Sequence, residues 1–240
     1  MRHELLDLVY KPEDLNFEYY NKIKDLGDVE LEHQIGRLTN FKKLLGEIFL
    51  NDTKGDIIEF GTWKGFSLLW IAYLCERIGI FDKKIIGIDG FIGLPDAEGP
   101  FQKGAFKNTS LKECWRNIFY NKYLYDITKK NVFIERFLYS QKENIIKRLR
   151  HLGVSKFSFV HIDCDLSSSV KEIFDILIEG NFLNEECYIL FDDYGCDSNL
   201  GATVDSILLN MQKEYEIKEH SSTKLTKNFK LRRKFYEINK

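Results

Sequence analysis

The alternation of apolar runs with amphipathic segments constrains the fold of this chain most strongly. Short runs rich in isoleucine, valine and phenylalanine have the pattern of buried strands, and they alternate with segments whose apolar residues recur at helical spacing. The predicted strands span residues 56–61, 84–89, 131–136, 157–163 and 187–193, and the predicted helices span residues 67–78, 143–152, 167–180 and 202–215. Such an order favours an α/β protein with a mostly parallel sheet covered by helices on both faces.

The two ends of the chain extend this alternating core. Within residues 13–50, apolar side chains recur at helical spacing at Ile35, Leu38, Phe41, Leu44, Leu45 and Ile48. We therefore expect a helical cap segment over residues 1–50 and the main domain over residues 51–240. Near the other end, residues 216–220 and 234–239 alternate polar and apolar side chains, which predicts a closing antiparallel hairpin.

Two internal segments carry further expectations. Residues 91–130 interrupt the alternation of strands and helices, and we expect residues 96–130, with the N-terminal helix, to cover the functional site and exclude water. The predicted helix over residues 167–180 begins with serine and ends with glycine, which is the usual asymmetry of helix capping.

Composition excludes several classes of function. The net charge of −2 gives no electrostatic support for nucleic-acid binding, and no apolar stretch approaches the roughly 18–20 residues that span a bilayer. The charged start of the chain lacks the apolar core of a signal peptide. The five cysteines are scattered and no pair has C-x-x-C spacing, so we interpret them as reduced thiols. We expect a cytoplasmic protein without nucleic-acid or membrane partners.

Acidic residues follow the predicted strands at four places. They are Glu59, Asp89, the pair Asp163 and Asp165, and the pair Asp192 and Asp193. Open α/β sheets bind their ligands beyond the carboxyl ends of the strands. Four acidic positions at one edge of the sheet therefore predict that the functional site lies there.

The first of these positions belongs to a glycine-bounded turn between a strand and a helix. Gly61 and Gly65 follow Glu59, and we place Thr62, between the glycines, and Ser67, after them, in the same candidate cofactor site. The spacing fits neither a Walker loop nor the dinucleotide fingerprint, because Phe66 and Trp63 stand at required positions. An acid here repels a pyrophosphate but suits the ammonium group of S-adenosylmethionine, which carries no phosphate. The alternative interpretation is a tight turn that needs glycine for steric reasons alone.

Asp89 ends the second predicted strand and is followed by Gly90 and Phe91. An acid at this point of a nucleotide-binding sheet accepts the ribose hydroxyls of a nucleoside. We therefore place Asp89 and the two residues after it in the same candidate cofactor site. The alternative is that the carboxylate only caps the turn.

The remaining acids suggest a metal site. If the last two parallel strands are neighbours, Asp163, Asp165, Asp192 and Asp193 converge, and unpaired carboxylates that close raise one another's pKa. A divalent cation relieves this repulsion, and oxygen ligands favour Mg²⁺, Mn²⁺ or Ca²⁺ over zinc. The alternatives are a helix N-cap by Asp165 and ordinary ion pairs. His161 lies on the same side of its strand as Asp163 and is either a core histidine, the interpretation we favour, or a base or ligand.

Two weaker features accompany this cluster. Cys164 and Cys196 lie near it in sequence, but no adjacent base marks either as an activated thiolate. The basic stretch 224–235 is interpreted as a solvated face of the hairpin, with attraction of an anionic substrate as the alternative.

Four motifs together resemble a known family. GDIIEFGTWKGFS (55–67), IDGFIGLP (88–95), HIDCDLSSSV (161–170) and FDDYG (191–195) are similar, in order and spacing, to the macrocin O-methyltransferase family of class I S-adenosylmethionine-dependent enzymes. The resemblance extends from about residue 55 to about residue 205 and includes the stretch 110–125. It implies a Rossmann-like class I methyltransferase fold, with a mostly parallel seven-stranded sheet and an antiparallel C-terminal hairpin.

The resemblance also implies an activity and roles for residues. It implies that a methyl group passes from S-adenosylmethionine to a hydroxyl, often on a sugar, with help from Mg²⁺ or Mn²⁺. Glu59, Gly61 and Gly65 would shape the methionine end of the cofactor site, and Asp89 would hold the ribose. The four aspartates of the two later motifs are the candidates for holding the metal, and Asp163 or Asp165 could take the proton of the acceptor hydroxyl.

The chain departs from the family pattern at three places. Ser167 stands where the family usually has tyrosine, the third strand leads into no glycine, and Phe66 replaces a small residue. These departures concern the acceptor and leave a sugar, a sugar nucleotide, a small phenol or an antibiotic intermediate open. The rival classes are a nicotinamide-dependent enzyme, which the missing fingerprint disfavours, and a non-catalytic partner subunit on the same scaffold. The N-terminal helix could also serve a homodimer.

Overall fold

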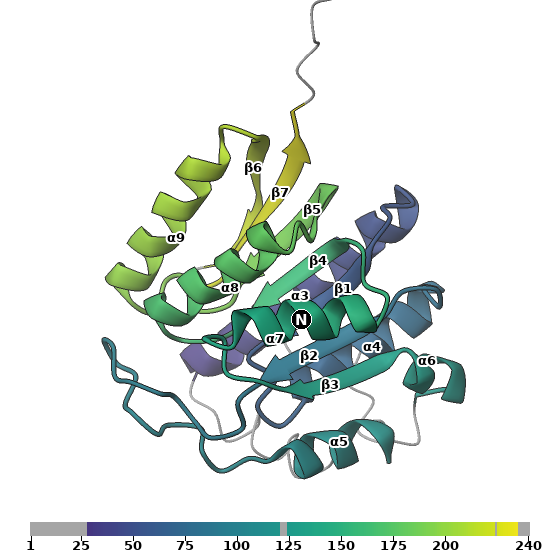
Figure 1. Ribbon diagram of the computed structural model, residues 1–240, viewed down its shortest axis with the longest axis horizontal. Coiled ribbons are helices and arrows are strands. Elements are labelled where there is room, and N and C mark those ends of the chain that lie inside the picture. Colours follow the sequence, from purple (N-terminus) through teal and green to yellow (C-terminus); the bar gives the residue numbers. More distant parts are fainter. Residues whose placement is uncertain (1–27, 121–123, 224, 235–240) are drawn as a thin grey trace, which may run out of the picture.

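The computed structural model describes residues 28–120, 124–223 and 225–234 (Figure 1). Its seven strands form one sheet in the order β3-β2-β1-β4-β5-β7-β6, which confirms the predicted α/β class. The strands are β1 (Asp56–Phe60), β2 (Ile85–Asp89), β3 (Val132–Arg136), β4 (Phe157–Ile162), β5 (Leu183–Phe191), β6 (Tyr215–Ser222) and β7 (Lys227–Arg233). Strands β1 to β5 pair in parallel, and β7 runs antiparallel to β5 and β6.

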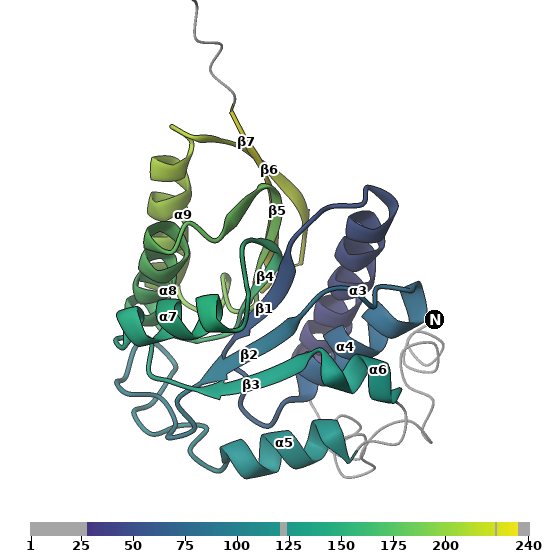
Figure 2. The same ribbon diagram turned by 45° about the vertical axis from the view of Figure 1, so that its right-hand side comes forward.

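Helices cover both faces of this sheet, as Figure 2 shows. Helices α3 (Asp28–Leu50) and α4 (Phe66–Ile78) lie on one face, and α7 (Lys142–His151), α8 (Ser167–Glu179) and α9 (Ser198–Met211) lie on the other. The short helices α5 (Leu111–Phe119) and α6 (Asp126–Lys130) follow the loop after β2. Because successive residues of a strand point to opposite faces, Ile57 packs into the α3–α4 layer and Ile58 into the α7–α9 layer.

The register brings the predicted acids to one edge. Phe60 of β1 pairs with Ile162 of β4, which pairs with Phe191 of β5. The residues that follow these three positions therefore lie side by side beyond the carboxyl ends of the strands. This arrangement confirms the predicted location of the acidic clusters at one edge of the sheet.

Helix α3 confirms the predicted apolar face and adds a polar one to it. Leu38, Phe41, Leu44, Leu45 and Ile48 are buried in the same core layer as α4, as their helical spacing predicts. His33, Gln34, Arg37 and Asn40 are buried on this helix as well. A buried polar stripe requires partners, and for His33 and Arg37 the partner is Asp192. The part of the predicted helix before residue 28 lies outside the described residues.

The C-terminal hairpin exists, but its second strand was predicted too late in the chain. Strand β7 occupies residues 227–233, and residues 235–240 lie outside the described part of the chain. The basic side chains of this strand meet acidic partners, since Lys230 and Arg232 both form ion pairs with Glu186. The prediction failed because the charged side chains of β7 hid its strand pattern. Their pairing agrees with the interpretation of a hairpin face.

The predicted N-cap of α8 is wrong, because Leu166 occupies that position without a capping side chain. Gly180 occupies the C-cap position as predicted, but with a right-handed φ of −71°. The Ser167 backbone N–H and hydroxyl instead both donate to the carboxylate of Glu98, which belongs to the loop after β2. The helix end is therefore satisfied by a residue distant in sequence, which local capping rules do not detect.

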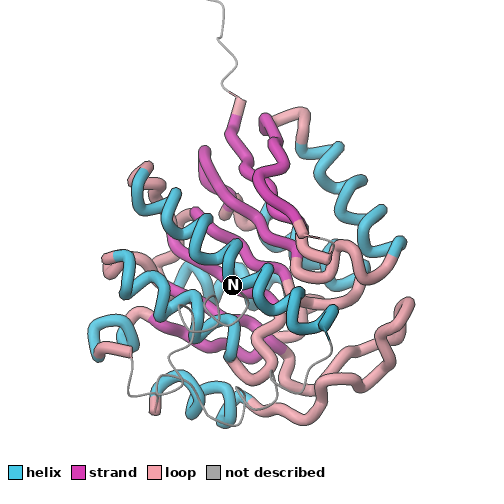
Figure 3. Tube along the Cα trace, turned by 180° about the vertical axis from the view of Figure 1, so that it is seen from behind, coloured by secondary structure: helices cyan, strands magenta, loops and turns pink. Residues whose placement is uncertain are grey.

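A long loop follows β2 and reaches over the edge where the parallel strands end. It extends from residue 90 to the start of α5 and is seen from behind in Figure 3 as a long projecting segment. Glu98 and Phe101 pair within it through two backbone hydrogen bonds of 3.0 and 2.9 Å. In the part of the chain described here, no helix is long and apolar enough to cross a bilayer.

Candidate active site

The turn after β1 needs its glycines for close backbone contact. Gly61 has φ +93°, and a Cβ atom there would lie 1.5 Å from the carbonyl oxygen of Asp163. Gly65, with φ +83°, precedes α4, where a Cβ atom would lie 2.7 Å from the Cys114 sulfur. Only glycine fits both positions, because the left-handed conformation and the close neighbours exclude a side chain. The turn thereby brings the end of β1 into direct contact with the end of β4.

A cavity of about 670 Å³ opens at the carboxyl ends of the parallel strands. Six of the predicted site residues line it, namely Gly61, Asp89, Gly90, Asp163, Asp165 and Asp193. The other predicted residues are buried or half-buried behind this lining, namely Glu59, Thr62, Gly65, Ser67, Phe91 and Asp192. The predicted cover is present in part, since residues of α3 and of the loop after β2 line the cavity. Its volume is in the range of small-molecule and cofactor sites.

Asp89 joins two turns and also faces the cavity. Its carboxylate accepts hydrogen bonds of 2.7 Å from the Trp63 backbone N–H and 2.6 Å from the Phe91 backbone N–H. Burial raises the pKa of Asp89, and these hydrogen bonds act in the opposite direction. The two interpretations of this residue are therefore compatible, because it caps the turns and remains accessible from the cavity.

Beneath the cavity, three buried residues form a row of charged groups. His161 Nδ1 forms a hydrogen bond of 2.9 Å with Glu59 Oε1, and His161 Nε2 lies 3.8 Å from Asp192 Oδ1. All three side chains are fully buried. Burial opposes protonation of His161, but the two flanking carboxylates outweigh it and raise the pKa of this histidine to about 9. His161 is thus a paired core histidine, which agrees with the favoured interpretation.

Asp192 is held by the helix α3. The Arg37 guanidinium forms a bidentate contact with Asp192, in which Nε donates to Oδ1 over 2.8 Å and Nη2 donates to Oδ2. Arg37 Nη1 also lies 3.4 Å from Asp163 Oδ2, and His33 Nε2 lies 3.0 Å from Asp192 Oδ2. Burial opposes ionisation of Asp192, but Arg37 and the two histidines hold the pKa of this carboxyl well below its usual range.

The other three aspartates have weaker compensation, which for Asp163 is the 3.4 Å contact with Arg37 Nη1. Ligand oxygens of Asp163, Asp165 and Asp193 lie within 4.8 Å of one another, and Asp193 belongs to a second such group with His33 and Asp192. Burial, followed by mutual repulsion, raises the pKa of Asp165 to about 8 and that of Asp193 well above its ordinary value. The Oδ2 atom of Asp193 is buried without a hydrogen-bond partner among the described residues.

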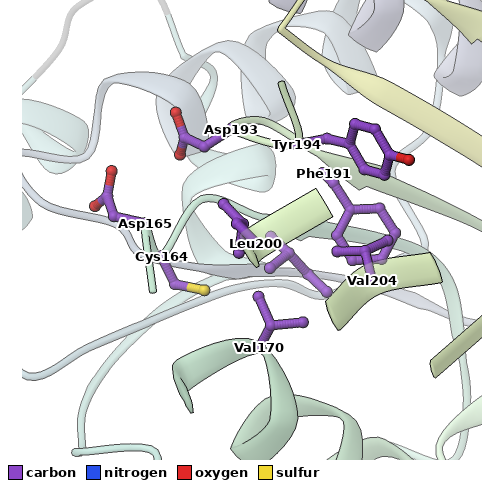
Figure 4. A pocket seen from close by; sticks show the side chains of 9 residues that line it. Cys164, Asp165, Val170, Phe191, Asp193, Tyr194, Leu200 and Val204 are labelled. Atoms are coloured by element: carbon purple, nitrogen blue, oxygen red, sulfur yellow. The ribbon is translucent and has the colours of Figure 1, made fainter. Parts of the chain in front are cut away.

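Figure 4 shows how two of these carboxylates are arranged. Asp165 and Asp193 point to the same side, away from the apolar side chains of Phe191 and Val204. Asp165 also has a left-handed backbone, with φ +62°, which is unfavourable for an aspartate and is typical of functional sites. Converging oxygens, raised pKa values and an unpaired buried oxygen fit a divalent cation.

Three residues at this site were not predicted from the sequence. His33 and Arg37 are polar residues on the buried face of an amphipathic helix, and that anomaly is the signal that could have revealed them. Glu98 lies in an irregular loop, where no periodic pattern marks a functional side chain. Cys196, interpreted as a bystander, lines the cavity and places its sulfur 3.4 Å from Asp193 Oδ1.

The fold and the site define a class I methyltransferase. The sheet has parallel strands and an antiparallel C-terminal pair. One cavity lies at its edge, next to the glycine turn after β1 and the acid at the end of β2. The chain belongs to the macrocin-O-methyltransferase (TylF) family, whose model matches residues 33–219. It is therefore an O-methyltransferase of the S-adenosylmethionine type, and the rival assignment as a nicotinamide-dependent enzyme is set aside.

Solved structures agree with this fold. The O-methyltransferase NovP is 18% identical, with a TM-score of 0.67, over 83% of this chain and 81% of that one. The calicheamicin methyltransferase CalS11 is 17% identical, with a TM-score of 0.62, over 96% of this chain and 90% of that one. At such low sequence identities, the similarity to these structures shows a shared fold. No curated protein sequence matches the chain.

Proposed function

We propose that this protein transfers the methyl group of S-adenosylmethionine to a hydroxyl of a sugar-containing small molecule, with a divalent cation bound by aspartates at the sheet edge. The observation that carries the proposal is that one cavity contains both Asp89, at the cofactor turns, and the three converging carboxylates of Asp163, Asp165 and Asp193. A nucleoside and an acceptor hydroxyl bound in that cavity would meet between these two groups.

The cofactor half of the cavity suits a sulfonium nucleoside. Gly61 allows the donor to approach the backbone, and Asp89 is the acceptor for the ribose hydroxyls. Glu59 lies fully buried behind this half of the cavity, and its Oε2 atom has no hydrogen-bond partner among the described residues, so its carboxylate would act on the ammonium group through its charge and not by direct contact. Thr62, Gly65, Ser67, Gly90 and Phe91 support this half of the site from the two turns.

Residues after the third strand complete the nucleoside site. The family's glycine is missing there, and Leu138 approaches Gly90 so closely that a Cβ atom on Gly90 would lie 2.7 Å from its Cδ2. Leu138 and Tyr139 both line the cavity. We propose that these two side chains form the adenine wall in place of the missing glycine.

The proposed reaction needs carboxylates for two roles, which are to bind a cation and to accept a proton. A divalent cation, when bound, lowers the pKa of the acceptor hydroxyl and orients it. Asp163, Asp165 and Asp193 are the residues that would hold it, with Asp192 as the fourth candidate. Asp165 or Asp163 would accept the proton of the hydroxyl. Arg37 compensates the charge of Asp192 and holds α3 against the site.

Calorimetric titration with S-adenosylhomocysteine tests the cofactor assignment directly. We expect micromolar binding to the purified protein, no binding of NAD⁺, and loss of at least about tenfold in affinity for Asp89→Asn. Asp82→Asn, a change on a distant surface turn, is the control. Absence of S-adenosylhomocysteine binding to the unmodified protein would overturn the proposed function.

The acceptor is proposed from similarity alone. The structure of CalS11 is also described as that of a TDP-rhamnose 3'-O-methyltransferase, and its TM-score with this chain is 0.56 in that form. A panel of sugar nucleotides, glycosides and phenols, each with and without Mg²⁺, identifies the acceptor by mass spectrometry. Turnover of phenols alone would contradict a sugar acceptor, and equal rates after chelation would contradict the role of the cation.

The cellular setting is part of the same proposal. All five cysteines carry free thiols, four of them buried, which is typical of a reducing compartment such as the cytoplasm. We also propose a homodimer, to be tested by light scattering of the purified protein.

A further inference from the structure

We propose that Glu98 is a positioning residue that fixes the acceptor wall of the cavity by capping helix α8 from the loop after β2. This inference rests on the proposed function, because it concerns how the acceptor of the methyl group is held. The contact itself is a property of the fold and is testable without any acceptor.

The contact satisfies a helix end that has no cap of its own. The Ser167 backbone N–H donates to Glu98 Oε2 over 2.9 Å, and the Ser167 hydroxyl donates to Glu98 Oε1. Leu166, at the N-cap position, provides no capping side chain. A carboxylate at a helix N-terminus accepts from unpaired N–H groups and interacts favourably with the helix dipole. Glu98 therefore replaces the local cap and binds the loop to α8.

The loop also lies close to the end of a second helix beside this contact. Gly99 has φ +54°, and a Cβ atom there would lie 2.2 Å from Oδ2 of Asp197, the N-cap residue of α9. Glu98 also pairs with Phe101 through backbone hydrogen bonds. The turn around Glu98 is thus folded on itself and seated against two helix ends.

The other end of the loop is attached to the cofactor turn. The Thr109 hydroxyl donates to the Trp63 carbonyl oxygen over 2.7 Å, and Phe106 packs edge-on against Trp63 with ring centroids 6.0 Å apart. Trp63 in turn donates to Asp89. The loop consequently spans the cavity between the cofactor turn and α8, and only the α8 attachment depends on Glu98.

The residues beside the Glu98 contact are those of the acceptor half. Leu94, Pro95 and Phe101 of the loop line the cavity together with Ser168 and Glu172 of α8. The carboxylates of Asp163 and Asp165 directly precede α8 in the chain. Loss of the Glu98 contact separates two walls of the acceptor half and leaves Asp89 and the Trp63 attachment in place.

The departure at position 167 from the family pattern now has a structural consequence. Ser167 is 8% exposed, and its small side chain gives the Glu98 carboxylate access to the backbone N–H behind it. A tyrosine in this buried position would have to displace that carboxylate. Ser167 and Glu98 therefore act as a pair, and the pair sets the acceptor wall of this particular chain.

Limited trypsin digestion with mass-spectrometric mapping tests the attachment. Lys103 and Lys107 are exposed in the loop and report its release from α8. We expect cleavage at these two sites to be about tenfold faster in Glu98→Gln and also faster, by a smaller factor, in Ser167→Ala, which removes the hydroxyl hydrogen bond and leaves the backbone one. Equal cleavage rates in both variants and the unmodified protein would overturn the proposal.

A matched control lies in the same loop. Among the described residues, the Asp96 carboxylate accepts from the backbone N–H of its neighbour Ala97, over 3.0 Å, and makes no contact with α8. Asp96→Asn removes the same charge without touching α8 and should change loop cleavage by less than about twofold. Cleavage at Lys54, an exposed site on a different loop, should stay constant in every variant.

The positioning role is tested by separating the kinetic constants, with TDP-rhamnose as the first acceptor probe. In Glu98→Gln we expect the acceptor KM to rise about tenfold, with kcat and the KM for S-adenosylmethionine changed by less than about threefold. A parallel rise of both KM values would overturn the assignment to the acceptor wall. If the unmodified protein binds no S-adenosylhomocysteine, the proposed function fails, while the digestion comparison still decides whether Glu98 holds the loop.

Discussion

Two adjacent aspartates at the end of β5 have opposite electrostatic surroundings. Asp192 points to Arg37 and His33, which hold its pKa well below the usual range against the effect of burial. For Asp193, burial and the neighbouring carboxylates instead raise the pKa. Arg37, which compensates Asp192, lies 155 positions away in the chain, so the sequence pair alone could not assign the two aspartates different roles.

Removal of the Arg37 charge tests how much the buried ion pair with Asp192 contributes to the free energy of unfolding. We expect Arg37→Gln to lower the free energy of unfolding by about 3–5 kcal/mol, because it leaves Asp192 buried and charged without its partner. Arg232→Gln breaks an exposed ion pair with Glu186 and should cost no more than about 1 kcal/mol. Urea denaturation of both variants measures the difference, and similar losses would contradict the importance of the buried contact.

Asp165, as a ligand of the proposed cation, should make the binding of that cation depend on pH. Its pKa in the folded protein, about 8, is above the ordinary value, so its ionisation opposes folding as pH rises from about 4 to 8 and favours cation binding. We expect the apparent affinity for Mn²⁺ to rise with pH and to level off above about 8. Titration of Mn²⁺ by electron paramagnetic resonance between pH 6 and 9 checks this, with Asp165→Asn as the variant that should flatten the curve. An affinity independent of pH would contradict a role for Asp165 as a ligand.

At the scale of the element, the turn between β1 and α4 has no room for a side chain. Gly61→Ala forces a left-handed alanine against the Asp163 carbonyl oxygen, and we expect a loss of at least about 1–2 kcal/mol of stability from conformation alone. Gly46→Ala, on α3 with open space around it, should instead stabilise by about 0.5–1 kcal/mol. Thermal unfolding measures whether each variant is less or more stable than the unmodified protein. Unchanged stability of Gly61→Ala would show that the turn can rearrange.

The elements were predicted where a local pattern encodes them. The parallel strands and α4, α7 and α9 lie within a few residues of their predicted bounds, except that β5 begins four residues earlier and α9 is displaced toward the N-terminus. The N-cap of α8 and the position of β7 were wrong, since one depends on Glu98 and the other on the pairing of charged side chains with Glu186. Both outcomes depend on contacts between distant parts of the chain.

For the whole molecule, cofactor binding should stabilise the fold. The cavity joins turns from β1, β2 and β4, so a ligand that bridges them binds the folded state alone. At one hundred times its dissociation constant, S-adenosylhomocysteine should add about 2.7 kcal/mol and raise the melting temperature by roughly 5–10 °C. Differential scanning fluorimetry measures the shift. The same shift in Asp89→Asn would contradict the placement of the nucleoside.

The arrangement of α3 was not accessible from its pattern alone. Its apolar residues pack in the same core layer as α4, and His33 and Arg37 reach the sheet edge. The proposed division of the chain at residue 50 stays a prediction, as does the cap segment before it. Within the described residues, this helix contributes to both the core and the site.

The sequence by itself determined the class of fold, the family and the edge of the sheet where the chemistry lies, because periodicity, glycine turns and acids after strands are local patterns. Only the tertiary structure decided which aspartates converge, that Arg37 compensates Asp192, and that Glu98 caps α8. The Glu98–Ser167 and Arg37–Asp192 contacts join residues 69 and 155 positions apart in the chain. Such distances are closed by packing of the whole chain, and no short stretch of sequence encodes them.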